Sequence, residues 1–186
     1  MSNSFFDQDV KLQTDSLTVF AHKILKKFGI SDAEVECINF EFNATFSVST
    51  QSGQKYALRL NINSTRTVSN IQAETQWVRD LARIPSINVP TPIASLDDQY
   101  LVSAQHADSG QMIYGVMYSW LEGEEIGDEP TLDQLHTVGR AMALLHENSS
   151  HFTLTDGAEL PTFNDFFWGT EDYLFSGKST LIPKDR

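Results

Sequence analysis

Residues 45–61 constrain the fold most, because two runs of alternating hydrophobic side chains flank Gln51-Ser52-Gly53-Gln54. Alternation with a period of two predicts β-strands, and a short glycine-containing segment between two strands predicts a hairpin. A similar alternation over residues 35–42 predicts a third strand, so we expect three consecutive antiparallel strands. The alternating residues of the hairpin are Phe46, Val48, Tyr56, Leu58 and Leu60.

Ala57 and Arg59 lie two residues apart in the second strand of this hairpin, so we expect both on the same face. Glu74 follows in a segment with helical spacing, from which its carboxylate would hold the Arg59 cation in place. A guanidinium can bind phosphate through two hydrogen bonds, and a small neighbour leaves room for a flat ring. The alternative is a surface salt bridge between hairpin and helix, worth about 0–1 kcal/mol.

Three segments show the spacing of amphipathic helices. The first covers residues 17–28, with Thr14 and Asp15 as capping candidates, and the second follows a capping-box pattern of Ser69 with Gln72. The third opens with Thr131 and Gln134 and ends near His146. Further strands are expected near 93–96, 100–104 and from Met112 to Trp120.

This order of elements predicts an α+β fold in three parts. We expect an antiparallel lobe with helices over residues 1–118, a hinge and acidic loop over 119–130, and the beginning of a helical lobe over 131–186. The aromatic residues from Phe163 to Phe175 follow no clear period. We expect them to need a partner surface, and therefore to favour oligomerisation of this chain.

Composition excludes several classes of protein. The 25 acidic and 13 basic residues give a net charge of −12, which argues against nonspecific nucleic-acid binding. The charge is compatible with a cationic small substrate, but solubility explains it equally well. No apolar run approaches the ~20 residues of a membrane span. Cys37 is the single cysteine, which suits a reducing cytoplasm and a small core side chain.

Six collinear stretches over about residues 30 to 150 resemble the aminoglycoside phosphotransferase and choline kinase-like family of small-molecule kinases. They resemble, in order, its phosphate loop, its third strand, its helix glutamate, the proline-rich entry to its fourth strand, its interlobe hinge and its Leu-His helix. The stretches are Asn43-Ala-Thr-Phe-Ser-Val, Tyr56-Ala-Leu-Arg-Leu, Gln72-Ala-Glu-Thr-Gln-Trp-Val, Val89-Pro-Thr-Pro-Ile, Val116-Met-Tyr-Ser-Trp-Leu-Glu-Gly and Gly139-Arg-Ala-Met-Ala-Leu-Leu-His.

The resemblance implies a protein-kinase-like fold and an ATP site between two lobes. It implies that Asn43 and Thr45 belong to the loop over the phosphates, that Arg59 holds the phosphates, and that Glu74 orients Arg59. It further implies that Ile38 and Ala57 sandwich the adenine ring. The backbone carbonyl of Ser119 and the backbone amide of Leu121 would meet the adenine edge.

The family's catalytic run, His-Gly-Asp-x-x-x-x-Asn, has no match in this sequence. We therefore expect no catalytic residue and no metal ligand in this chain, with the ligands of Mg²⁺ beyond Arg186. The resemblance implies transfer of phosphate to a hydroxyl of a small molecule, and inactivity of this chain alone. A noncatalytic nucleotide-binding or interaction module, and an α+β protein-binding domain without nucleotide, remain as alternatives.

Two short patterns are interpreted as unrelated to this chemistry. Asp165 and Phe166 resemble the start of a kinase metal-binding motif but lack its glycine, and burial of the aromatic side chains is the simpler interpretation. His146-Glu147 with His151 resembles a zinc motif, but the second histidine comes one position too late for one helix face.

Overall fold

The computed structural model describes residues 4–124, 126–155 and 157–161. In chain order the elements are the 3₁₀ turn η1 (Phe5–Asp7), α1 (Val10–Leu25), η2 (Lys26–Phe28), β1 (Ala33–Phe40), β2 (Ala44–Thr50), β3 (Lys55–Asn61), α2 (Val68–Leu81), β4 (Pro92–Ile93), β5 (Leu101–Gln105), β6 (Met112–Ser119) and α3 (Leu132–His151). The residues of two predictions, Phe163–Phe175 and the pair Asp165 and Phe166, lie outside the described residues.

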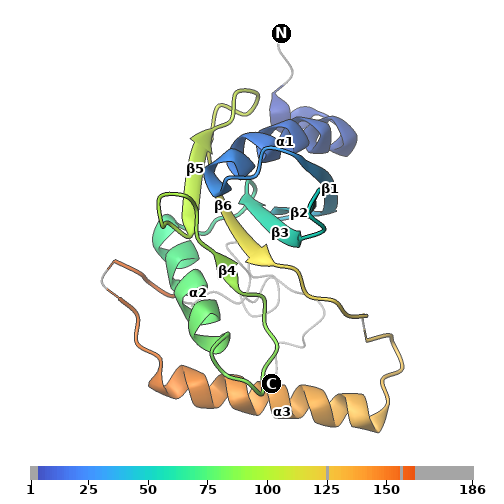
Figure 1. The fold of residues 1–186 in the computed structure, drawn as a ribbon, viewed down its shortest axis with the longest axis vertical. Helices are drawn as coiled ribbons and strands as arrows, with labels where there is room; N and C mark the ends of the chain where they lie inside the picture. Colours follow the sequence, from blue (N-terminus) through green and yellow to red (C-terminus); the bar gives the residue numbers. More distant parts are fainter. Residues whose placement is uncertain (1–3, 125, 156, 162–186) are drawn as a thin grey trace, which may run out of the picture.

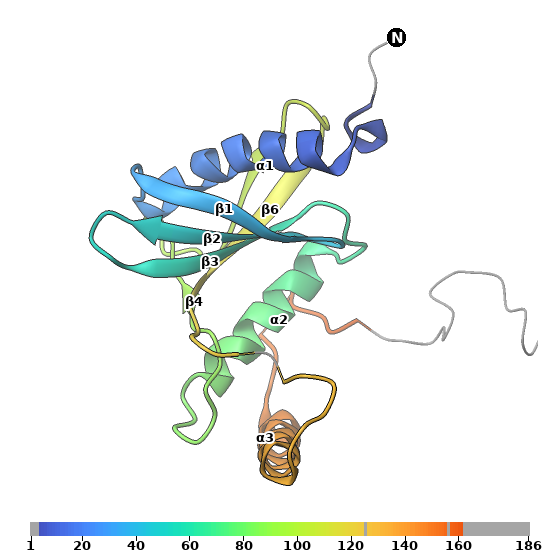
Figure 2. The same cartoon turned by 90° about the vertical axis from the view of Figure 1, so that its right-hand side faces the viewer.

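The strands form one antiparallel sheet in the order β1-β2-β3-β6-β4, with β5 also paired to β6. Helix α1 covers one face of this sheet and α2 lies on the other, with α3 beyond α2 (Figures 1 and 2). The three consecutive antiparallel strands predicted from the alternating side chains are confirmed as β1, β2 and β3. The α+β architecture of an antiparallel sheet with helices is confirmed as well.

The main core lies between α1 and the sheet. Its fully buried members come from α1 and from the alternate residues of β2, β3 and β6, and include Leu17, Ile24, Phe46, Val48, Leu58, Leu60 and Met117. Gly115 of β6 lies where α1 comes closest to the sheet. A Cβ atom there would stand 3.2 Å from both Ile24 Cγ2 and Leu60 Cδ2, so even alanine would require these side chains to shift by a few tenths of an ångström.

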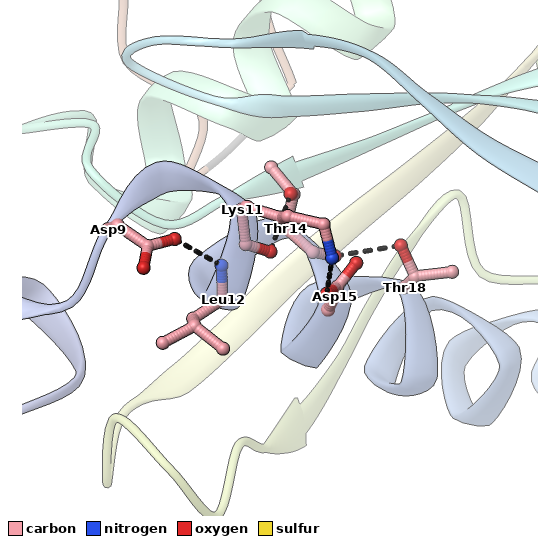
Figure 3. A network of polar contacts seen from close by, with 6 residues as sticks. All are labelled: Asp9, Lys11, Leu12, Thr14, Asp15 and Thr18. Atoms are coloured by element: carbon pink, nitrogen blue, oxygen red, sulfur yellow. Dashed lines mark hydrogen bonds and ion pairs between the residues drawn. The ribbon is translucent and has the colours of Figure 1, made fainter.

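Helix α1 begins earlier than the sequence indicated. Asp9 is the residue before the helix, and its side chain accepts a hydrogen bond of 2.9 Å from the backbone amide of Leu12 (Figure 3). Thr14 and Asp15, the predicted caps, lie within the first two turns and bond to other residues of the helix. The prediction was wrong because Asp9 already supplies an acceptor for the free amides of the first turn.

The other predicted helix ends have mixed outcomes. Helix α2 is capped by Thr67 in a capping box with Asn70, two residues before the predicted Ser69 pair. Thr131 and Gln134 form the predicted capping box of α3, which continues past His146 to His151. Strand β4 is shorter than the predicted 93–96 because the amides of Ser95 and Leu96 bond to the carbonyls of Gln99 and Lys27 and not to a neighbouring strand.

Helix α3 exposes much of its apolar surface, including Leu135, Val138 and Met142 of the predicted stripe, whereas Leu145 of that stripe is half-buried. Its apolar side chains Leu132, Leu135, Val138 and Met142 are between 40% and 76% exposed. Asn148 near its end connects it to α2, because the amide accepts a 2.8 Å hydrogen bond from Trp77 Nε1 and donates one of 2.8 Å to Asp80 Oδ2. None of the described helices has the length and apolar character needed to cross a membrane.

His106 is buried where α1 meets the loop between β5 and β6. Its Nε2 lies 3.0 Å from Ser16 Oγ and its Nδ1 lies 2.9 Å from Ser109 Oγ, while Phe5 and Phe20 contact its ring edge to face. Burial lowers the pKa of His106 below its usual value of 6.5. Asp108 opposes this shift, and Lys23 adds to it.

We therefore expect the free energy of unfolding to fall as the pH drops below about 6.5. Between the lowered pKa of the folded state and the ordinary pKa of the unfolded state, the unfolded chain binds more protons, so acid favours unfolding. Urea unfolding between pH 7.5 and 5 measures this dependence. His106→Gln should reduce its slope, whereas the exposed His22→Gln should retain it. Equal slopes in the wild type and His106→Gln would contradict the assignment.

Candidate functional site

The face of the sheet opposite α1 brings Ala57 and Arg59 together, as their spacing predicted. Leu58 and Leu60 are buried under α1, so the alternate residues of β3 project from the other face. Ala57 pairs with Tyr118 of β6, and Arg59 pairs with Thr45 of β2. This face, which also meets α2, is the candidate site.

Arg59 and Glu74 form the ion pair predicted from the sequence. Arg59 Nη1 donates to Glu74 Oε1 at 2.5 Å, with the two side chains 20% and 42% exposed. Arg59 Nε and Nη2 are buried and have no hydrogen-bond partner among the described residues. Two unpaired buried donors beside a fixed positive charge are suited to an anionic oxygen-rich group.

The surroundings keep this cation charged and its position defined. Burial alone would lower the pKa of Arg59, but the hydrogen bond that it donates to Glu74 and the electrostatic interactions with Tyr118 and Glu74 more than offset this effect, and the net shift of the pKa is upward. The guanidinium carbon lies 5.6 Å from the centre of the Tyr118 ring. Burial raises the pKa of the Tyr118 phenol, which is therefore neutral and offers its ring to the cation.

The loop between β1 and β2 borders the candidate site. Thr45 lies next to Arg59 across the strand pair, and Asn43 Oδ1 is buried without a hydrogen-bond partner among the described residues. Asn63 holds the loop by donating to the carbonyl of Glu41 at 2.9 Å. Ile38 stands at an irregularity in the β1–β2 register and is 49% exposed, so its apolar side chain is free for contact.

Ser119 and Leu121 lie where β6 leaves the sheet. The Ser119 amide donates to the carbonyl of Thr91 at 2.8 Å, and its hydroxyl accepts from the Thr91 amide at 2.9 Å, which anchors the end of the strand. Leu121 follows in a segment without helix or strand and is 38% exposed. Ser119 pairs with Tyr56, the residue before Ala57, and Leu121 follows two residues later.

Two further residues lie at this end of β3 and β6 and were not predicted from the sequence. Lys55 Nζ lies 3.8 Å from the centre of the Trp120 ring, and Trp120 Nε1 is buried with no hydrogen-bond partner in the described part of the chain. Lys55 is two residues before Ala57, and Trp120 is two residues after Tyr118. Alternation places Lys55 on the face of Ala57 and Trp120 on the face of Tyr118, but only the pairing of β3 with β6 brings the two together.

The described residues form neither a metal site nor an activated nucleophile. In residues 4–124, 126–155 and 157–161, no group of three or more His, Cys, Asp or Glu side chains is placed to hold a metal ion. Cys37 is half-buried and packs against the main core. Burial raises the pKa of its thiol, so the thiol is protonated and is not an activated nucleophile.

An antiparallel sheet with a buried arginine on its open face, paired to a glutamate of the following helix, defines a kinase-like lobe. The structure of a microcompartment-associated aminopropanol kinase shares this fold, with a TM-score of 0.66 and 26% sequence identity over 78% of this chain and 45% of that chain. An amicoumacin kinase in complex with AMP-PNP, Ca²⁺ and Ami also shares it, with a TM-score of 0.63 and 16% identity over 80% of this chain and 45% of that chain.

The sequence matches no protein-family profile and no curated protein. The two similar structures are small-molecule kinases of the aminoglycoside phosphotransferase-like type, so the resemblance and the kinase-like fold predicted from the sequence are confirmed. The chain spans about 45% of the length of each of these proteins.

Proposed function

We propose that this chain forms the nucleotide-binding part of an ATP-dependent phosphotransferase that phosphorylates a hydroxyl group of a small molecule. Its parts are a nucleotide-binding lobe over residues 1–118, a hinge over 119–130 and the beginning of a helical lobe over 131–186. The single cysteine is consistent with a cytoplasmic enzyme.

The proposal rests on the hydrogen bonding of the Arg59 guanidinium. Its Nη1 atom is used by Glu74, whereas Nε and Nη2 are buried and unpaired among the described residues. An unsatisfied buried donor costs about 1–3 kcal/mol, and phosphate oxygens of ATP would remove that cost twice. The likeness to a kinase solved with AMP-PNP supports the same ligand class.

The remaining residues of the site receive roles by position. Ala57 and Ile38 contact the two faces of the adenine, and the backbone of Ser119 and Leu121 meets its edge. Asn43 lies in the loop between β1 and β2, and Thr45 lies beside Arg59 at the start of β2. Backbone amides of such a loop stabilise phosphate charge.

Mg²⁺ supplies charge neutralisation to the phosphates when it is bound. The described residues can bind the nucleotide but do not form a metal site, because they offer no cluster of metal ligands and the sequence has no His-Gly-Asp-x-x-x-x-Asn run. In this proposal the chain binds and orients ATP, and its described residues do not supply the ligands of Mg²⁺.

Titration of the 186-residue chain with ATP, with and without Mg²⁺, tests this proposal. We expect saturable binding that Mg²⁺ strengthens and no release of ADP in the presence of hydroxylated amines, sugars or aminoglycosides. Binding that ignores Mg²⁺ would favour a noncatalytic nucleotide-binding module. The absence of any ATP binding would overturn the proposal. Turnover by this chain alone would contradict the expectation that the chain binds ATP without transferring phosphate.

Ala57→Leu should lower the affinity for ATP by about tenfold or more. The larger side chain would project from the open face of β3 into the space assigned to the adenine, at a cost of about 1–3 kcal/mol. Inorganic tripolyphosphate lacks the ring, so its binding to Arg59 should be unchanged. Calorimetric titration of both ligands checks this, and an equal loss for both would place the adenine elsewhere.

A further inference from the structure

A cavity of about 410 Å³ lies between α2 and β5, away from the candidate nucleotide site. Helix α2 contributes Gln72, Thr75, Gln76 and Arg79 to its wall. By helical spacing these residues share one face of α2, on the opposite side of the helix from Glu74. The cavity and the Arg59–Glu74 pair therefore lie against two faces of one helix.

The charge of this cavity is positive although the chain as a whole carries a net charge of −12. Arg79 is charged, and the other described residues that line the cavity are neutral. The Arg79 guanidinium carbon lies 3.9 Å from the centre of the Tyr100 ring. Stacking holds the plane of the guanidinium and leaves the N–H groups at its edge available.

Arg79 makes no hydrogen bond or ion pair within the part of the chain that the structure describes. Arg83 lies four residues later, just past the end of α2. It differs from Arg79 in that its Nη1 lies 3.7 Å from Asp80 Oδ1 and its side chain is largely exposed. Arg79 is thus a positioned cation in a concave site without a carboxylate partner. Gln72, Gln76 and Gln99, which are neutral, line the same cavity.

We propose that this cavity binds a small organic anion, a carboxylate or phosphate monoester with a compact apolar body. Arg79 would hold the anionic group through paired hydrogen bonds, with the glutamine amides as additional donors. Val68, Leu101 and Tyr114 provide apolar surface for the body of the ligand. A cavity of this volume accommodates a ligand of about ten non-hydrogen atoms.

Occupancy of this site is expected to change nucleotide affinity, a consequence that rests on the proposed function. Thr75 is buried, lines the cavity and neighbours Tyr118, whose ring lies against Arg59. An anion that holds α2 in place keeps Glu74 against Arg59 and should strengthen ATP binding. By thermodynamic linkage, ATP should strengthen anion binding by the same factor.

An NMR titration of the ¹⁵N-labelled chain tests the site with three probes of similar shape: phenyl phosphate, benzoate and neutral benzamide. We expect both anions to shift the Arg79 side-chain Nε–H resonance and benzamide to leave it unchanged. Arg79→Gln should weaken binding of phenyl phosphate by about tenfold or more. Arg83→Gln removes the same charge four residues later, just past the end of α2 and outside the cavity, and should leave the affinity unchanged.

Three outcomes would overturn the site: equal shifts with benzamide, equal losses in Arg79→Gln and Arg83→Gln, or loss of anion binding in Arg59→Met, which would place the anion at the nucleotide site. If Arg79→Gln fails to fold, the wild-type comparison of phenyl phosphate with benzamide decides. Anion binding without any ATP binding would overturn the proposed function and leave the anion site standing, so the two failures are distinguishable.

Discussion

Arg59→Met should lower the affinity for ATP by about 100-fold or more while the chain remains folded. Two buried donors, Nε and Nη2, are lost together with the positive charge that they carry. Hydrogen bonds to charged groups contribute about 1.5–3 kcal/mol each, so the loss of two corresponds to more than two orders of magnitude in affinity. Calorimetric titration with ATP in the presence of Mg²⁺ measures the change.

The fold should tolerate this substitution because methionine keeps most of the side-chain volume. It removes the two unpaired donors, and the Glu74 side chain that it leaves without a partner is 42% exposed and can be hydrated. We expect a change in the free energy of unfolding of about 1 kcal/mol or less. Arg83→Met is the matched control, with unchanged ATP binding. Wild-type affinity in Arg59→Met would exclude Arg59 as the phosphate ligand.

The Arg59–Glu74 pair could be predicted from local periodicity together with the resemblance to small-molecule kinases. Alternation along a strand decides which residues share a face, and helical spacing decides which side of α2 carries Glu74. The resemblance supplied the remaining part, that the helix packs on the face of the sheet that carries Arg59. The structure brings the two side chains to 2.5 Å, as expected.

Other features depend on contacts between distant segments, and local patterns do not contain them. The neighbours of Trp120 follow from the pairing of β3 with β6, which are separated by α2 and two short strands. The cavity beside Arg79 exists because α2, β5 and Thr155 meet there. The start of α1 was missed for a different reason: several residues near that end can cap a helix, and the choice of Asp9 depends on where the preceding chain turns.

Phe46→Ala should have the largest effect on stability, a loss of about 3–5 kcal/mol in the free energy of unfolding. Phe46 is fully buried in the core between β2 and α1 and pairs across the sheet with Leu58. Its removal leaves a cavity that the strands on either side cannot close. The free energy of unfolding of a native protein is about 5–15 kcal/mol, so this loss would unfold a substantial fraction of the molecules.

Phe42→Ala is the matched control, because Phe42 lies four residues earlier in the same hairpin and is 72% exposed. It should change stability by about 0.5 kcal/mol or less. Urea unfolding monitored by circular dichroism measures both variants. A loss of less than about 1 kcal/mol in Phe46→Ala would contradict the core described for this lobe.

Phe46→Ala and Arg59→Met together test whether the two faces of the sheet act independently. Phe46→Ala acts on the face covered by α1, so ATP binding should fall in proportion to the folded fraction and recover its wild-type affinity where the variant is folded. Arg59→Met acts on the open face, so binding should be lost without unfolding. If both variants instead lost stability and affinity together, the nucleotide site and the core would not be independent, and the open face would have a structural role that the unpaired donors of Arg59 do not indicate.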